Sequence, residues 1–274
     1  MHGTVARLIL SLVVLLSGPA ILSAQPGSPF QLPDGCTLPF ENGTTGNDID
    51  QQCGPEGDPS QSPAPADRVA AQNRAKNNFC AGADVALATL LTFNRLEKAA
   101  EASGVAFGDR ETLPADRSPL KGLYTTSEGD NLGEGSVVVF VGFLVKAKTE
   151  PGGESVNCGV TGAETNDFHI ELSSSRQPSS RCNVVVAEMS PHFRPEGWNV
   201  KALNKLRKPV RVTGQLFFDA SHKACKNGQP LPQQPVRNSL WEIHPVYGFD
   251  VCANSSLSAC RFDDDAVWTA LTDL

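Results

Sequence analysis

Five stretches of strand-like sequence, interrupted once by a helical stretch, constrain the fold of this chain more than any other feature. The strand-like stretches are residues 135–148, 167–173, 182–191, 209–219 and 239–252. In 167–173, apolar and polar side chains alternate strictly, which is the period of a strand with one buried face. Between the third and fourth stretches, residues 198–208 carry Val200, Leu203 and Leu206 three positions apart, and this spacing predicts a short amphipathic helix.

Three strands, one helix and two strands is the element order of the OB fold, a five-stranded Greek-key barrel. A small open sheet with a helix on one face has the same count of elements. The barrel is favoured because the first and fourth predicted strands each carry a central glycine, Gly142 and Gly214, where tight coiling needs one. We therefore predict a mainly β domain, an OB-like barrel, over residues 134–252.

The remaining segments are appendages of this domain, because 274 residues with 40% hydrophobic composition suit one globular core. Residues 1–24 have the basic start, apolar core and small-residue end of a secretory signal peptide. Its apolar run is shorter than the about 20 residues of a membrane-spanning helix, so cleavage is favoured over a retained anchor. No later stretch is long and apolar enough to span a membrane. Residues 25–66, rich in Pro and Gly, predict a leader that is flexible or pinned by a disulfide.

Short helices are predicted on both sides of the barrel. Residues 67–133 form a helical segment that packs on the barrel, with its clearest helix over 92–104. The stretch 84–91 fits a strand or a helix equally well. The tail 253–274 ends in a short helix over 263–274, where three acidic residues at the start favour the helix dipole.

All eight cysteines lie beyond the signal peptide, and none forms the close CxxC pair of a metal site. Their even number predicts disulfide bonds and an exported protein, periplasmic or extracellular. Two disulfide pairs are predicted from the positions of their cysteines in the chain and in the barrel. Cys252 and Cys260 close a short local loop, and Cys182 and Cys225 connect two places at the same end of an OB barrel.

Several long strings extend this interpretation, among them GGESVNC (152–158), NDFHIEL (166–172), QLFFDASH (215–222) and SLWEIHPV (239–246). In this order they resemble strings in a family of exported bacterial proteins that has no assigned biochemical function. The likeness covers roughly residues 67–252. It implies export and a single β-rich domain, and it assigns no catalytic residue.

Imidazole and carboxylate groups gather on the predicted strands and their connections. The candidate cluster consists of His169, Glu188, Asp219, His222, Glu242 and His244. Such groups together are the ligands of zinc or another divalent transition metal, which activates water for hydrolysis at neutral pH. Histidines on the polar face of a strand also often hydrogen-bond only to neighbours, so a structural polar network explains the same residues.

Two classes of function therefore stay open. The first is a non-enzymatic secreted module without a cofactor, whose barrel face, lined by His169, Glu171, Trp241 and Tyr247, binds an oligosaccharide, a nucleic acid or a protein. The second is a metal-dependent hydrolase that uses the candidate cluster. The catalytic motifs HExxH and GxSxG and both phosphate-binding glycine motifs are missing from the sequence. The net charge of −7 argues against tight non-specific binding of nucleic acid.

Overall fold

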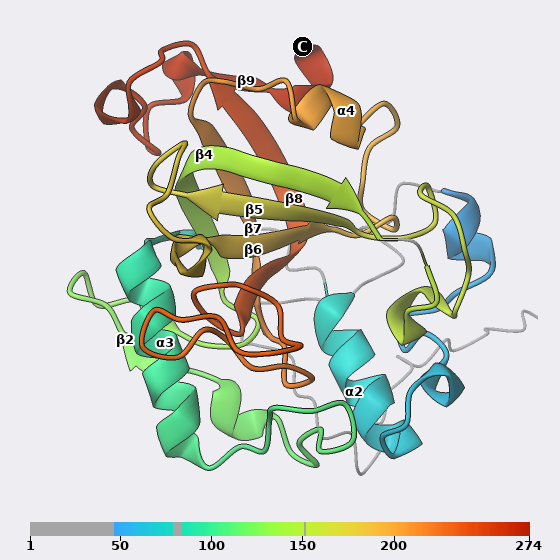
Figure 1. Cartoon of the computed structure of the whole chain (residues 1–274). Coiled ribbons are helices and arrows are strands. Elements are labelled where there is room, and N and C mark those ends of the chain that lie inside the picture. The colour runs from blue at the N-terminus through green and yellow to red at the C-terminus, as the bar shows by residue number, and fades with distance from the viewer. Residues whose placement is uncertain (1–46, 79–83, 151) are drawn as a thin grey trace, which may run out of the picture.

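The computed structural model describes residues 47–78, 84–150 and 152–274, which appear in colour in Figure 1. The predicted signal peptide lies outside these residues, as do Cys36 and Cys80. None of the described helices combines the length and the apolar content that are needed to cross a membrane.

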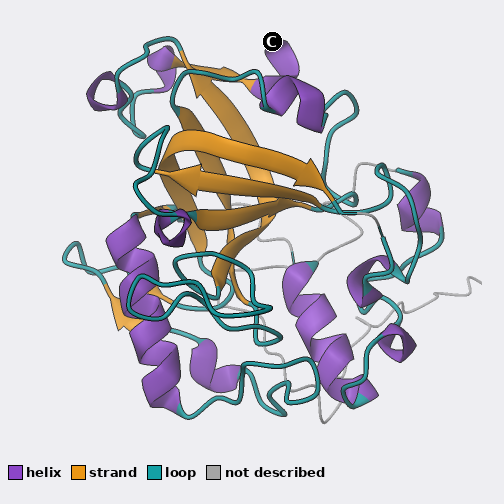
Figure 2. Ribbon diagram, in the orientation of Figure 1, coloured by secondary structure: helices purple, strands orange, loops and turns teal. Residues whose placement is uncertain are grey.

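A closed barrel of five strands forms the centre of the molecule (Figure 2). Its strands are β4 (Val137–Thr149), β5 (Phe168–Ser173), β6 (Val185–Met189), β7 (Val210–Phe218) and β8 (Trp241–Cys252). The strands pair in the order β4, β5, β6, β8, β7, and pairing of β7 with β4 closes the barrel. Only β6 and β8 run parallel, whereas the other four neighbouring pairs are antiparallel. The prediction of a mainly β, five-stranded barrel is confirmed.

Alternation along β5 decides which side chains enter the barrel. Phe168, Ile170 and Leu172 are buried in the main hydrophobic core, whereas His169 and Glu171 are half-buried on the outer face. All five barrel strands contribute to this core, and burial of apolar surface stabilises the fold by about 25 cal/mol per Å². Consequently, the polar residues of β5 lie outside the barrel.

Two glycines allow strands to approach closely. A Cβ atom on Gly214 would lie 2.4 Å from a backbone carbonyl oxygen of β8, and the register of β7 with β8 shifts on both sides of Gly214. A Cβ atom on Gly142 would lie 2.5 Å from the carbonyl oxygen of Ser173. The register shift in β4 falls between Leu144 and Lys146, so Gly142 provides space and not the bulge itself.

The helix between the third and fourth barrel strands is present but shorter than predicted. It is α4 (Val200–Leu203), and the side chain of Asn199 caps its first turn. The predicted helix over 198–208 ends early because Asn204 binds the strand β4. The Asn204 side chain accepts a hydrogen bond from the backbone N–H of Ala147 and donates one to its carbonyl oxygen.

Two α-helices and three short strands precede the barrel in the described part of the chain. They are α2 (Ala66–Lys76), β1 (Ala86–Ala88), α3 (Leu90–Ser103), β2 (Tyr124–Thr125) and β3 (Asn131–Leu132). The ambiguous stretch therefore forms a strand that pairs in parallel with β4, followed by the start of α3. Thr89 caps α3, and Gly104 ends it in a left-handed conformation. Phe93 of α3 packs edge-on against Phe140 of the barrel, as expected for a segment that covers it.

The prediction of a helix over 263–274 is wrong. This stretch forms β9 (Trp268–Ala270), which pairs with the end of β8, between two 3-10 turns. The edge of β8 is available there because β6 pairs with β8 only at Glu242 and Ile243. The 3-10 helices among the described residues are η1 (Asp48–Gln51), η2 (Pro59–Gln61), η3 (Ser118–Leu120), η4 (Ser155–Asn157), η5 (Arg181–Asn183), η6 (Leu257–Ala259), η7 (Asp265–Val267) and η8 (Leu271–Asp273).

Disulfide bonds join the outer segments to the barrel. The described cysteines form the pairs Cys182–Cys225, Cys252–Cys260 and Cys53–Cys158. The first two are the predicted pairs. The third connects the described part of the Pro/Gly-rich leader to the β4–β5 connection, so residues near Cys53 are held against the barrel and are not a free linker.

Candidate functional site

A cavity of about 630 Å³ lies against the outer face of β5 and β6. The β4–β5 connection and the β7–β8 connection form two of its walls, and α2 forms another. Five of the six predicted site residues line it: His169, Glu188, Asp219, His222 and Glu242. The sixth, His244, is fully buried and contacts Glu188. The structure therefore brings the six predicted residues together beside β5 and β6.

One half of this cluster is organised by an arginine. The Arg237 guanidinium lies between the carboxylates of Asp219 and Glu242 and donates hydrogen bonds to both. Asp219 also contacts Nδ1 of His222 at 2.6 Å through Oδ2. Burial alone would raise the pKa of Asp219, but Arg237 and His222 outweigh burial and hold that pKa well below its usual range. Arg237 was not predicted, because it lies in an irregular loop without a motif.

The other half is centred on Glu188. Its Oε1 lies 3.0 Å from Nε2 of His169, and its Oε2 lies 3.0 Å from Nδ1 of His244. Oε2 of Glu188, Nε2 of His169 and both His244 nitrogens have no aligned hydrogen-bond partner, so we treat these contacts as ion pairs. Burial favours the neutral imidazoles, but the Glu188 carboxylate outweighs it and raises the pKa of His169 to about 9 and that of His244 to about 10.

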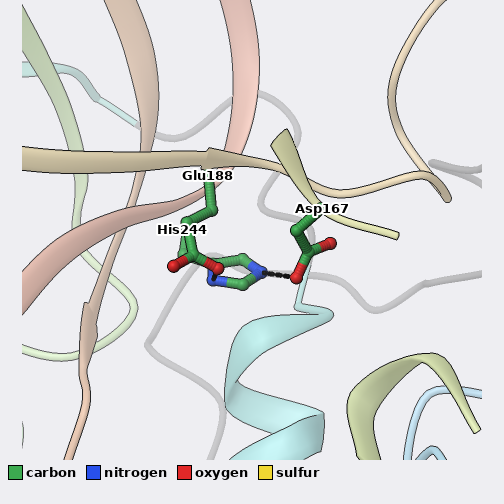
Figure 3. Close-up of side chains that lie close together, drawn as sticks. All are labelled: Asp167, Glu188 and His244. Carbon is green, nitrogen blue, oxygen red and sulfur yellow. Dashed lines mark ion pairs between the residues drawn. The ribbon is translucent and has the colours of Figure 1, made fainter. Parts of the chain in front are cut away.

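Asp167, which was not predicted as a site residue, completes a compact group with Glu188 and His244. Its Oδ2 lies 3.8 Å from Nε2 of His244, and both residues are fully buried. Asp167, Glu188 and His244 each offer one ligand atom, and these atoms lie within 4.8 Å of one another (Figure 3). Burial raises the pKa of Asp167 to about 7. Its position before β5 gave no sequence signal of burial, because a polar residue at the start of a strand usually faces solvent.

Lys76 adds a cation from α2, the helix beneath the group in Figure 3. Its ammonium lies 5.6 Å from the centroid of the Phe217 ring. Burial acts to lower the pKa of Lys76, but Glu154, Glu188 and other nearby carboxylates outweigh it and raise that pKa. A helix remote in sequence therefore supplies a positive charge that local pattern analysis does not reveal.

The rim of the cavity carries paired charges and lacks the predicted aromatic residues. Arg181 forms an ion pair with Glu171 at this rim. Trp241 is fully buried in the barrel core. The hydroxyl of Tyr247 donates a hydrogen bond to the carbonyl oxygen of Asn78, and Tyr247 does not line the cavity. The expectation that Trp241 and Tyr247 form the binding face is wrong, because β8 turns the first inward and packs the second against the segment after α2.

No family model, no curated protein and no solved structure matches this chain. The interpretation of the site depends on its geometry.

Proposed function

We propose that this protein is an exported, non-enzymatic binding module of OB-like architecture whose ligand occupies the cavity beside β5 and β6. The observation that carries the proposal is the position of the cavity. OB barrels bind oligosaccharides and oligonucleotides on the face of their second and third strands, between the first–second and fourth–fifth connections. In this chain those elements are β5, β6, the β4–β5 connection and the β7–β8 connection. The volume of about 630 Å³ suits a small ligand.

Export is supported by the predicted signal peptide and by the disulfide bonds that join described cysteines. The likeness of the four long sequence strings to exported bacterial proteins agrees with it. Export to the periplasm or beyond also gives a binding module access to ligands outside the cytoplasm.

A short oligosaccharide fits the cavity better than a nucleic acid or a protein. Its walls present carboxylate, guanidinium and imidazole groups, which hydrogen-bond to hydroxyls in either direction. Most of the cations there are already paired, as in Arg181 with Glu171 and Arg237 with Asp219. A nucleic acid needs unpaired cations and aromatic platforms, and the described lining contains no aromatic ring other than imidazole. A protein partner needs a broader surface than a cavity of this volume offers.

Hydrolysis is the second candidate, and the arrangement of the histidines favours it less. His222 contacts Asp219, whereas His169 and His244 contact the two oxygens of Glu188. The three imidazoles therefore do not converge as ligands of one metal ion. A binding function needs only the polar walls.

The test is a screen of the full exported chain against soluble oligosaccharides and oligonucleotides, read by thermal shift and then by calorimetry. The cavity variants Glu171→Gln and His222→Ala should each lower the affinity for the oligosaccharide that the screen identifies by about tenfold. Each variant loses one charged hydrogen bond to the ligand. Asp263→Asn is the matched control, because Asp263 pairs with Arg261 on the surface away from the cavity. Exclusive binding of oligonucleotides, or equal effects of control and cavity variants, would refute the proposal.

A further inference from the structure

We propose that Asp167, Glu188 and His244 bind one divalent transition-metal ion at the floor of the cavity. Their ligand atoms lie within 4.8 Å of one another, and all three residues are buried. One imidazole nitrogen with two carboxylate oxygens is a ligand set for zinc, manganese or iron(II), whereas calcium and magnesium favour oxygen ligands alone. The proposal is independent of which ligand the cavity binds.

The strongest support is unsatisfied hydrogen-bonding capacity. Among the described residues, no group donates a hydrogen bond to either carboxylate oxygen of Asp167, which is 0% exposed. The two nitrogens of His244 and Oε2 of Glu188 also lack aligned partners. A buried carboxylate without a donor costs about 1–3 kcal/mol or more, so native proteins rarely keep one without an ion or another group to satisfy it.

The distances are compatible with an ion that draws the side chains slightly together. Ligand atoms about 2.1 Å from zinc are separated by about 3.4 Å at a tetrahedral centre. The separation of Nε2 in His244 from Oδ2 in Asp167 is 3.8 Å, and that of Nδ1 in His244 from Oε2 in Glu188 is 3.0 Å. Because one imidazole uses one nitrogen for one ion, binding through Nε2 requires the Glu188 carboxylate to move from Nδ1 toward Nε2 and Asp167.

Neighbouring residues orient the three ligands and leave a path for the ion. His169 contacts Oε1 of Glu188, whereas His244 contacts Oε2, and so His169 helps to fix the orientation of this carboxylate. Phe217 packs edge-on against the His244 ring at 5.6 Å between centroids and restrains it. Glu188 lines the cavity, so an ion reaches the group from there.

The local charge is balanced while His169 and His244 are protonated. Five carboxyl groups then face five cations: Glu154, Asp167, Glu188, Asp219 and Glu242 against Lys76, Arg194, Arg237 and the two imidazoles. An ion and the proton of His244 compete for the same imidazole, because coordination requires its neutral form.

The experiment is calorimetric titration of the untagged full chain, cleared of metal with a chelator, with zinc alone, and with manganese, magnesium and calcium in parallel. We expect one zinc per chain, weaker manganese binding and no binding of magnesium or calcium at the same concentrations. Asp167→Asn and His244→Gln should each lower the affinity for zinc by about 100-fold or more. His169→Ala should lower it by about 10-fold to 100-fold. His222→Ala, a histidine of the same cavity outside the group, should change zinc affinity less than about threefold.

No stoichiometric zinc binding, or binding that survives both Asp167→Asn and His244→Gln, would overturn the proposal. If those variants fail to fold, anomalous diffraction from zinc-soaked crystals of the wild-type protein decides. A peak between Asp167, Glu188 and His244 supports the site, and a peak elsewhere or none refutes it.

Discussion

Two buried clusters of charged residues flank Phe217, and they differ in how completely their polar atoms are satisfied. In the first, Arg117 donates to both oxygens of Glu134, to Gln72 and to the carbonyl oxygen of Phe218. Glu134 also accepts the backbone N–H of Phe218. In the second, the group of Asp167, Glu188 and His244, five side-chain atoms lack aligned partners.

The difference separates a structural cluster from a functional one. A fully bonded buried pair fixes the packing of the segments that carry it, because removal of one partner leaves an isolated charge. A buried group with unsatisfied atoms lowers stability unless something else binds to it. Of the charged residues in the two clusters, Glu188 lines the cavity, whereas Arg117 and Glu134 do not. The incomplete bonding of the second cluster is therefore the physical basis for the inferred ion site.

The largest expected loss of stability comes from the cluster of Arg117 and Glu134, whose polar atoms are hydrogen-bonded. Glu134→Gln leaves Arg117 buried, 1% exposed, without its carboxylate, and should lower the free energy of unfolding by about 3–5 kcal/mol. Urea denaturation at neutral pH measures it. A loss below about 1 kcal/mol would show that Arg117 is not held by this pair, and would remove the contrast between the two clusters.

A smaller effect is expected at Asp219, because Glu242 still pairs with Arg237 when Asp219 changes. Since Arg237 and His222 hold the pKa of Asp219 below its value in the unfolded chain, the folded state keeps this carboxylate ionised to lower pH. The stability it contributes is present above the unfolded pKa of about 3.9 and is lost as the pH falls through the lower folded value.

Asp219→Asn should therefore lower stability at neutral pH and flatten its decline in acid. Urea midpoints of the wild type and the variant between pH 2 and pH 7 give the comparison. Parallel curves at all these pH values would contradict the role of Asp219.

In the cluster of Asp167, Glu188 and His244, removal of a carboxylate should not lower the stability of the metal-free protein. In chelator-treated protein, Asp167→Asn removes a buried carboxylate that accepts no hydrogen bond from the described residues, so the free energy of unfolding should stay within about 1 kcal/mol of the wild type or increase. Urea denaturation with chelator present measures it. A loss as large as that of Glu134→Gln would show that Asp167 is a structural residue.

The smallest effect is expected at Lys76. Lys76→Gln removes a cation that interacts with Asp167 and Glu188, so zinc should bind about fivefold more tightly. The change is readily measured by competition with a chromogenic chelator. Arg261→Ala, which removes an exposed cation far from the group, is the control and should leave zinc affinity unchanged. Weaker zinc binding in Lys76→Gln would mean that Lys76 supports the group and does not compete with a cation.

The sequence predicted the barrel well because its signals are local. Alternation in β5 and the change of period before α4 are properties of neighbouring residues, and so is the loop that Cys252 and Cys260 close. The predicted helix at the C-terminus failed because the free edge of β8 offered pairing that acidic residues at a helix start did not outweigh.

The site was predicted only in part, for the same reason. His169, Glu188, Asp219, His222 and Glu242 were found because strand alternation and hairpin order bring them to one face. The contributions of Lys76, Asp167 and Arg237 depend on how α2 and the connections fold over that face. Such contacts join residues far apart in the chain and leave no periodic signal.

Zinc-dependent stabilisation tests the contrast between the two clusters most directly. The free energy of unfolding is measured in urea with chelator and with free zinc at about 100 times its dissociation constant, for the wild type, Asp167→Asn and Glu134→Gln. We predict that zinc raises it by about 2.7 kcal/mol in the wild type and in Glu134→Gln, and not in Asp167→Asn. An equal gain in all three proteins, or none in the wild type, would contradict the assignment of the unsatisfied cluster as the metal site.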